Sequence, residues 1–311
     1  MAKLIMTVAE MQDENKWLEM RNMGLGGSDA SIVVGLNKWK SPFSLWLEKT
    51  GQSEPEDLSN NEYVYWGKVL EEVVANRFCE LTGKKVQKRG LLQSEEYPFM
   101  LASVDRMVIG ENAGLECKTA NGFAGKQWED DEVPDAYYIQ CQHYMAVTGC
   151  DKWYIAVLIG GNKFIWKCIE RNQQDIDVLI GAEKDFWHKV QNNIMPAVDG
   201  SDDCAKTLAE KFSSVIPEAV NLPAEAEFVV KTLRETKSVI DDLEAQKTLQ
   251  ENRLKEMLGS YEVGYIGDEK ISWKQQKGRE TFNKKQFEKD YPDIAKNYTK
   301  IGNPIRVLRI G

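Results

Sequence analysis

The chain has 311 residues, which is enough for one large domain or for one domain with an appendage. Hydrophobic residues make up 42% and charged residues 29% of it, the balance of a soluble globular protein, and no run approaches the roughly 20 apolar residues needed to span a bilayer. The formal net charge of −9 argues against a protein coated with positive charge for nucleic acid.

Cysteine and histidine usage narrows the possible metal chemistry. The six cysteines are scattered without a C-x-x-C pair, which disfavours zinc and iron–sulfur sites and suggests a reducing compartment. Only two histidines are present, so hydrolases whose metals are held by clustered imidazoles are disfavoured as well. The beginning of the chain turns acidic too soon for a signal peptide. We therefore expect a cytoplasmic protein with carboxylates as its available metal ligands.

Periodicity and capping signals predict an α/β protein over the first two thirds of the chain. Ser28 is the expected N-cap of a short helix, and Pro42 and Gly51 mark the start and end of another. Helices are predicted over 11–23, 28–35, 41–51, 61–83, 134–149 and 171–195, and strands over 85–93, 99–109 and 113–119. Residues 151–170 predict a hairpin with its turn at the Gly-Gly-Asn of 160–162. This order indicates a mixed central β-sheet flanked by helices.

The pattern changes after a boundary that we place near residue 215. Over 223–258 the apolar residues approximate a heptad seam, interrupted by Lys247 and Gln250, and predict one long helix. Such a helix is too long to pack only on its own small domain, so it packs on another helix or subunit or forms an arm. We therefore divide the chain into a domain over 1–215 and an extension over 216–311.

The last part of the extension, predicted to be a small α+β tail, is basic. From Ser260 to Gly311 eleven Lys and Arg stand against seven Asp and Glu, with Trp273 and Phe282 inside the densest run. One interpretation is a solvated hairpin whose lysines protect an exposed edge. The other is contact with a nucleic-acid backbone.

Three charged residues interrupt the apolar strands over 99–119. Glu116 and Lys118 are two residues apart and therefore share one face of a strand, and Asp105 lies on the strand before. Paired carboxylates are ligands that suit Mg²⁺ or Mn²⁺, and a neighbouring lysine can hold a water or neutralise charge on a phosphate. The simpler alternative is an exposed strand pair with an ion pair between Glu116 and Lys118.

The spacing VD-x10-ExK resembles the motif of the restriction-endonuclease-like nuclease superfamily. The stretch RNMGLGGSDASIVVGLNKWKSPFSLWLEKTG, followed by WGKVLEEVVANRFCELTG and IQCQHYMAVTG, closely resembles the YqaJ-like viral recombinase / phage lambda exonuclease family. The resemblance covers about residues 15–200 at several separate motifs. It implies a restriction-endonuclease-like core that acts on DNA.

The resemblance assigns roles residue by residue. Asp105 and Glu116 match the metal-binding acids, Lys118 matches the catalytic lysine, and Glu71 matches a helix glutamate that faces the metal site. Gln140 matches the glutamine that orients the lysine or the phosphate. A solvated helix surface is the alternative for Glu71, and a helix-face hydrogen bond is the alternative for Gln140.

Two further positions lie next to the residues of this motif. The backbone carbonyl of Cys117 lies between the two site residues and is a natural third metal ligand, while its thiol is expected in the core. Where related enzymes often carry a small residue after the first acid, this chain has Arg106, which either touches DNA or lies along the surface.

The GLGGSDA segment supplies a second candidate site. Its glycines precede a helix start, which suits an anion, although plain capping by Ser28 is a rival explanation. In the resembled family, the arginine and serine of this segment bind the terminal 5′-phosphate, and Arg21 and Ser28 occupy those positions.

We therefore expect a Mg²⁺-dependent 5′→3′ double-strand DNA exonuclease, with Mn²⁺ as the other possible metal. It would act from phosphorylated ends in phage-type recombination and leave 3′ single strands. The resemblance implies a homotrimeric ring around DNA and a single-strand-annealing protein as partner. Two rivals are an endonuclease of the same superfamily and a non-enzymatic scaffold that binds DNA ends.

Overall fold

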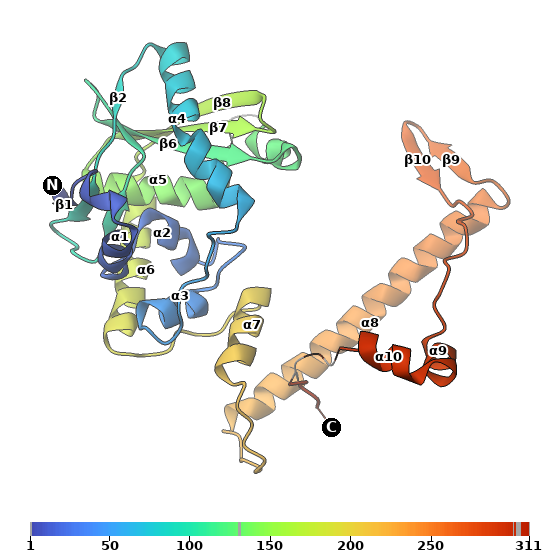
Figure 1. The fold of residues 1–311 in the computed structure, drawn as a ribbon. Helices are drawn as coiled ribbons and strands as arrows, with labels where there is room; N and C mark the ends of the chain where they lie inside the picture. The colour runs from blue at the N-terminus through green and yellow to red at the C-terminus, as the bar shows by residue number, and fades with distance from the viewer. Residues whose placement is uncertain (1, 130–131, 301, 303–305, 311) are drawn as a thin grey trace. The chain divides into compact units, whose positions relative to one another are not determined.

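The computed structural model describes residues 2–129, 132–300, 302 and 306–310. It divides into two compact units, Met1–Lys211 and Phe212–Gly311, which we refer to as the first and second units. The first unit carries the sheet and helices expected from the sequence, and the second carries the long helix (Figure 1). Each unit is considered by itself below.

The first unit is built from helices that begin and end at the expected signals. Ser41 caps a helix that begins with Pro42, and Gly83 and Gly149 end two others in the left-handed conformation. The helices of this unit are α1 (Glu14–Asn22), α2 (Gly27–Val33), α3 (Pro42–Lys49), α4 (Glu62–Thr82), α5 (Asp135–Thr148), α6 (Gln173–Gln191) and α7 (Asp202–Lys211), with 3-10 turns at Glu10–Gln12 and Gly122–Trp128.

Its strands form two sheets. The five-stranded sheet has the order β2-β5-β6-β7-β8, with β6 and β7 parallel and the other neighbours antiparallel. Its strands are β2 (Val86–Gln87), β5 (Arg106–Val108), β6 (Ala113–Ala120), β7 (Lys152–Ile159) and β8 (Lys163–Glu170). A smaller antiparallel sheet has the order β1-β3-β4 and consists of β1 (Ala2–Met6), β3 (Leu91–Ser94) and β4 (Leu101–Ser103). A mixed sheet flanked by helices is thus confirmed.

Helices cover both faces of the five-stranded sheet (Figure 1). The alternation along β7 decides which side chains meet which helix: Trp153 and Ile155 pack with α5, whereas Tyr154 packs with Phe78 of α4. A third cluster gathers α2, α3, α6 and α7 around Phe43. The sheet is therefore buried on both faces, and a polar side chain on either face of β6 lies against a helix rather than in open solvent.

The structure corrects several details of the prediction. Strands were expected over 85–93 and 99–109, but each stretch divides between the two sheets, the second of them at Val104 and Asp105. Ser28 is not the N-cap of α2, because the helix begins one residue earlier and Gly26 takes that position. β1 and α7 were not predicted.

The second unit contains α8 (Glu225–Leu258), the hairpin of β9 (Val263–Ile266) and β10 (Glu269–Ser272), and the short helices α9 (Lys284–Asp290) and α10 (Pro292–Tyr298). The hairpin begins close to the end of α8, where Leu258 is buried beside Gly264. Within the residues that the structure describes, no helix is both long and apolar enough to cross a membrane.

Candidate active site

Asp105, Glu116 and Lys118 lie together because a change of sheet occurs beside β6. The chain leaves β4 and enters β5 at Asp105, and β5 pairs with β6 so that Arg106 lies opposite Leu115. One carboxylate oxygen of Asp105 accepts a hydrogen bond from the backbone N–H of Cys117 at 2.7 Å. Glu116 and Lys118 point to the α5 face of the sheet, and the Cys117 side chain packs in the α4 cluster on the opposite face.

Gln140 of α5 joins the acid and the base. Its Nε2 donates to Oε1 of Glu116 at 2.7 Å, and its Oε1 accepts from Nζ of Lys118 at 3.1 Å. Lys118 also donates to Glu116 at 2.5 Å. Gln140 is itself held by Tyr144, whose hydroxyl accepts from Nε2 at 2.9 Å and donates to the carbonyl of Ser103 at 3.1 Å. The predicted lysine, acid and glutamine therefore form one connected network.

Burial and neighbouring charges shift the pKa values of the ionisable groups in and beside this network. Burial and the neighbouring Glu116 raise the pKa of Asp105 well above its usual value. Burial disfavours the ammonium of Lys118, but Glu116 and Asp105 outweigh it and raise the pKa of Lys118 above its usual value. The ring of Tyr137 lies 4.9 Å from Lys118 Nζ and adds a cation–π contact. Lys118 is thus a cation in this arrangement and not a free base.

One atom of the cluster indicates where a cation would bind. Oε2 of Glu116 is buried and has no hydrogen-bond partner among the described residues. An unpaired buried carboxylate oxygen is costly, and a hard divalent cation satisfies it. Within the described ranges, no three His, Cys, Asp or Glu side chains converge on one point. A metal held here would therefore rely on Asp105, Glu116 and a backbone oxygen such as the Cys117 carbonyl.

Glu71 is close to this cluster but is bound to another residue. Its charge contributes to the raised pKa of Asp105, yet its Oε1 pairs with Arg106 Nη1 at 2.5 Å. Arg106 is only 3% exposed and also pairs with Glu72 at 2.8 Å. This placement corrects the expectation that Arg106 lies along the surface, since its guanidinium is buried and pairs with two glutamates. Contact of Arg106 with DNA stays a prediction. Arg106 fixes the position of Glu71.

Arg21 and Ser28 also lie together, between the end of α1 and the start of α2. Arg21 donates to the Ser28 hydroxyl at 2.5 Å, and its guanidinium lies 5.3 Å from the Trp17 ring. Ser28 is exposed and Arg21 half-buried, so the pair faces solvent. The hydroxyl has this freedom because Gly26, and not Ser28, caps the helix.

A buried carboxylate organises the base of the Arg21–Ser28 pair. Burial would raise the pKa of Asp29, but Lys49 and Arg21 outweigh it and lower that pKa to about 2. Asp29 accepts from Lys49 at 3.1 Å and from the backbone N–H of Gly26 at 3.0 Å. Asp29 therefore holds the first turn of α2 in place, together with the side chains of Lys49 and Arg21.

Gly27 brings the two clusters into contact. A Cβ at this position would lie 2.5 Å from the ring of Tyr144 and 3.1 Å from Cγ of Gln140. Only glycine allows the start of α2 to pack this closely on the α5 residues that hold Glu116. The Arg21–Ser28 pair is consequently next to the acidic cluster in the folded chain.

Sequence analysis missed three supporting residues. Tyr144 could have been found, because it lies one helical turn after Gln140 on the same face of α5. Asp29 also had a local signal, since an acid at the third helical position often bonds the N-cap backbone. Lys49 had none, because its contact with Asp29 joins two segments that are distant in the chain.

The fold is similar to that of an alkaline exonuclease of known structure. The crystal structure of an alkaline exonuclease (LHK-Exo) from Laribacter hongkongensis matches 58% of this chain and 94% of its own, with a TM-score of 0.51 and 21% identity. The same enzyme in complex with dAMP matches equally, with a TM-score of 0.51 and 22% identity.

Sequence comparison identifies the family to which the chain belongs. The YqaJ-like viral recombinase domain matches residues 16–151. The uncharacterized protein YqaJ of Bacillus subtilis (strain 168) is 41% identical over 315 residues, covering 100% of this chain and 97% of that protein. The chain belongs to the YqaJ-like viral recombinase family.

Proposed function

We propose that the protein is a metal-dependent nuclease that degrades duplex DNA from its ends in phage-type recombination. The observation that carries this proposal is the pair of buried Glu116 and half-buried Asp105 beside Lys118, with Oε2 of Glu116 lacking a partner among the described residues. Family membership and the fold of an enzyme described as an alkaline exonuclease support it.

The acidic pair suits Mg²⁺, with Mn²⁺ as the alternative. Asp105, Glu116 and the Cys117 carbonyl would hold the metal, and Glu71, positioned by Arg106, would assist from α4. When bound, the metal supplies a Lewis acid for a phosphoryl oxygen and lowers the pKa of a water. A bound cation would relieve the repulsion between the Asp105 and Glu116 carboxylates, which raises the pKa of Asp105.

Lys118 and Gln140 would act on the phosphate and the attacking water. Lys118 remains protonated beside Glu116, so its ammonium is placed to orient a water and to stabilise negative charge that develops on the phosphate. Gln140 limits the positions open to both side chains, since it bonds Glu116 and Lys118 at the same time.

Arg21 and Ser28 would bind the 5′-phosphate of the strand being degraded. The guanidinium and hydroxyl are 2.5 Å apart and accessible, and a phosphate would accept from both. Because Gly27 packs this site against Gln140, a bound end would lie near the acidic cluster. Digestion would then run 5′→3′ and leave 3′ single strands.

The remaining features of the proposal come from the resemblance to this family. We propose that the nuclease works as a homotrimer around DNA in the cytoplasm and that it delivers its single strand to an annealing protein. We place the nuclease in residues 1–215 and regard residues 216–311 as an extension.

Nucleotide release from three DNA substrates tests the proposal. Linear duplexes with 5′-phosphate ends, linear duplexes with 5′-hydroxyl ends and a closed circle are compared with Mg²⁺ or EDTA present. We expect rapid release from phosphorylated ends only, loss of at least a hundredfold in Lys118→Ala, and loss of the preference for phosphate in Arg21→Ala.

The other outcomes distinguish the rival functions. Cutting of the circle at the rate of the linear duplex would make the protein an endonuclease. DNA binding with no metal-dependent release from any substrate would make it an end-binding scaffold. Both results would contradict the proposed exonuclease.

A further inference from the structure

The long helix α8 presents apolar side chains to solvent. Val229, Ile240, Leu243 and Met257 each expose more than half of their surface in the described part of the chain, from 52% for Ile240 to 79% for Met257. α8 has 34 residues, so at 1.5 Å per residue it is about 51 Å long. A stripe of this length that remains exposed indicates a surface for association.

The four residues named above belong to a heptad repeat, whereas the exposed Phe228, Val239 and Leu249 of α8 lie outside it. Positions alternate by three and four along the whole helix, which is the spacing of the contact seam between two wrapped helices. The seam consists of Ala226, Val229, Leu233, Thr236, Ile240, Leu243, Lys247, Gln250, Leu254 and Met257. Seven of these ten positions are apolar, so the seam can bury a continuous surface.

We propose that α8 pairs antiparallel with α8 of a second copy of this chain. In the proposed register Ile240 packs against Leu243 of the partner subunit, and the two-fold axis lies between the two contacts. The same register places Val229 against Leu254 of the partner subunit and Ala226 against the partner's Met257. These contacts cover Val229, Ile240, Leu243 and Met257.

Lys247, the charged residue of the seam, favours this orientation and register. Lys247 meets Thr236 of the partner subunit, and each of them can keep its polar group toward solvent. In a parallel pair in register, Lys247 would meet the partner's Lys247, and like charges in contact oppose association. A shift of the antiparallel register by one heptad would place Lys247 against the partner's Val229 or the partner's Leu243.

Charges beside the seam favour the same pairing. In the antiparallel register Lys237 flanks Glu244 of the partner subunit, and the two-fold symmetry repeats this ion pair. No pair of like charges flanks the seam in this register. In a parallel pair the residues that would flank each other form no ion pair, so charge complementarity separates the two orientations.

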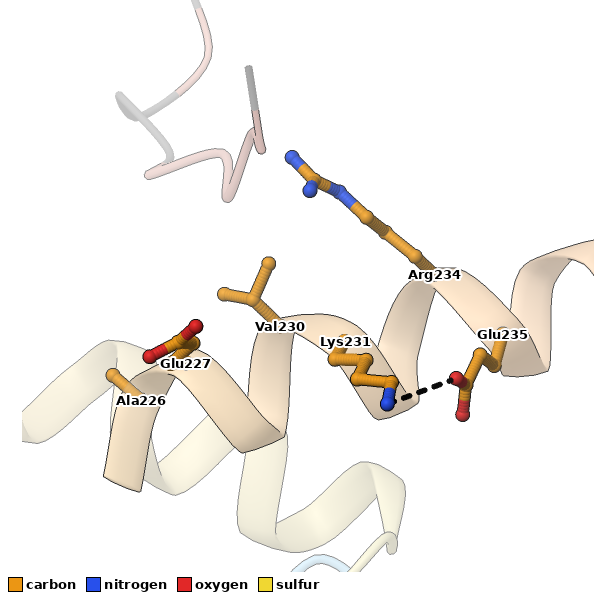
Figure 2. Close-up of a pocket in the computed structure, with 6 residues that line it drawn as sticks. All are labelled: Ala226, Glu227, Val230, Lys231, Arg234 and Glu235. Carbon is orange, nitrogen blue, oxygen red and sulfur yellow. Dashed lines mark ion pairs between the residues drawn. The ribbon is translucent and has the colours of Figure 1, made fainter. Parts of the chain in front are cut away.

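The outer side of the helix provides a matched control. Figure 2 shows Lys231 and Glu235 as an ion pair along α8, and their Nζ and carboxylate oxygen are 3.9 Å apart. Neither residue belongs to the seam or flanks it in the heptad pattern. Lys231→Glu therefore makes the same change of charge as Lys237→Glu without altering the proposed contact.

The oligomeric state of the full chain tests the pairing. Light scattering after size-exclusion chromatography is expected to give an even multiple of the 35.5-kDa chain, which is six chains if two of the proposed trimers pair through α8. Ile240→Asp is expected to halve that mass. Ile240 is 52% exposed within the chain, so this change does not disturb the core of either unit. An odd multiple, or an unchanged mass in Ile240→Asp, would refute the proposal.

Charge exchange tests the orientation. By sedimentation, Lys237→Glu and Glu244→Lys are each expected to weaken self-association about tenfold, whereas Lys231→Glu leaves it unchanged. An equimolar mixture of the two weakened variants is expected to recover wild-type affinity, because each Glu of one chain then faces a Lys of the other. Failure of the mixture to recover, or equal weakening by Lys231→Glu, would reject the antiparallel register.

Discussion

At the scale of single residues, Asp105 and Glu116 place two carboxylates where a stable core would have none. Both lie beside β6, and the only cation that contacts Glu116 among the described side chains is Lys118. Such a site sacrifices folding stability for chemistry, as active sites commonly do. Two predictions concern this cluster and the glycine that packs against it.

Asp105→Asn is expected to stabilise the metal-free protein at pH 7, because burial and the neighbouring Glu116 raise the pKa of this carboxyl and make its ionised form unfavourable in the folded state. A group whose folded pKa is raised makes folding less favourable as pH rises, and the amide removes that effect. If the proposed function holds, Mg²⁺ is expected to raise the melting temperature of the wild type, and the same variant is expected to lose both this increase and cleavage. Thermal unfolding with and without Mg²⁺ measures both, and Asp185→Asn, at an exposed position of α6, is the control.

Gly27→Ala is expected to lower stability by about 1–3 kcal/mol and to reduce DNA cleavage, because the added methyl would meet the Tyr144 ring at 2.5 Å. Displacement of Tyr144 would loosen Gln140 and through it Glu116. Gly181→Ala in α6 is the matched control, since its Cβ would meet open space and alanine favours the helix. Urea unfolding and nucleotide release should separate the two variants, and equal effects would contradict the close packing.

At the scale of elements, α5 is held on both sides by polar contacts. One side carries Gln140 and Tyr144 toward the acidic cluster, and the other carries His143 toward α6. His143 Nδ1 and Glu183 are 2.7 Å apart and fully buried, and His143 Nε2 lies 2.9 Å from the Leu101 carbonyl. A shift of α5 would therefore be transmitted to the candidate active site.

This buried pair predicts that stability falls as pH rises. Burial opposes the imidazolium, but Glu183 outweighs it and raises the pKa of His143 above 6.5, while burial raises the pKa of Glu183 above 4.5. The folded state therefore binds more protons than the unfolded state. The contribution of His143 is complete below pH 6.5 and is lost as pH passes through its folded pKa. Urea unfolding between pH 6 and about 9 should show this decline in the wild type, and the double variant His143→Gln with Glu183→Gln should flatten it.

At the scale of the whole molecule, the division after Lys211 separates the candidate active site from the proposed pairing helix. The acidic cluster and the Arg21–Ser28 pair lie in the first unit, and α8 lies in the second. Cleavage and self-association through α8 are therefore expected to be separable.

A chain ending at Lys211 is expected to remain folded, to release nucleotides and to lose association through α8. A chain ending at Gly200 lacks α7, whose Asp203 accepts from the Ser44 hydroxyl at 2.5 Å and whose Cys204 is buried in the cluster around Phe43. We expect this shorter chain to be less stable by about 2–4 kcal/mol. Circular dichroism, melting temperature and nucleotide release compare the two, and an inactive but folded chain ending at Lys211 would show that the second unit contributes to catalysis.

Local patterns along the sequence determined most of the elements of this protein. Helical periodicity and caps predicted α3, α4, α5 and α6, and alternation around two glycines predicted the β7–β8 hairpin, because these signals act between residues close in the chain. Spacing placed Glu116 and Lys118 on one face of a strand for the same reason. The heptad of α8 was also evident, since it repeats within a single helix.

Tertiary structure decided how these pieces meet. The division of 99–109 between two sheets brought Asp105 to the N–H of Cys117, and no pattern within that stretch indicated the break. Arg106 took Glu71 as a partner, and Lys49 took Asp29, through contacts between distant segments. Burial then set the charge state of each group, because the cost of an ionised side chain depends on all that packs around it and not on its neighbours in sequence.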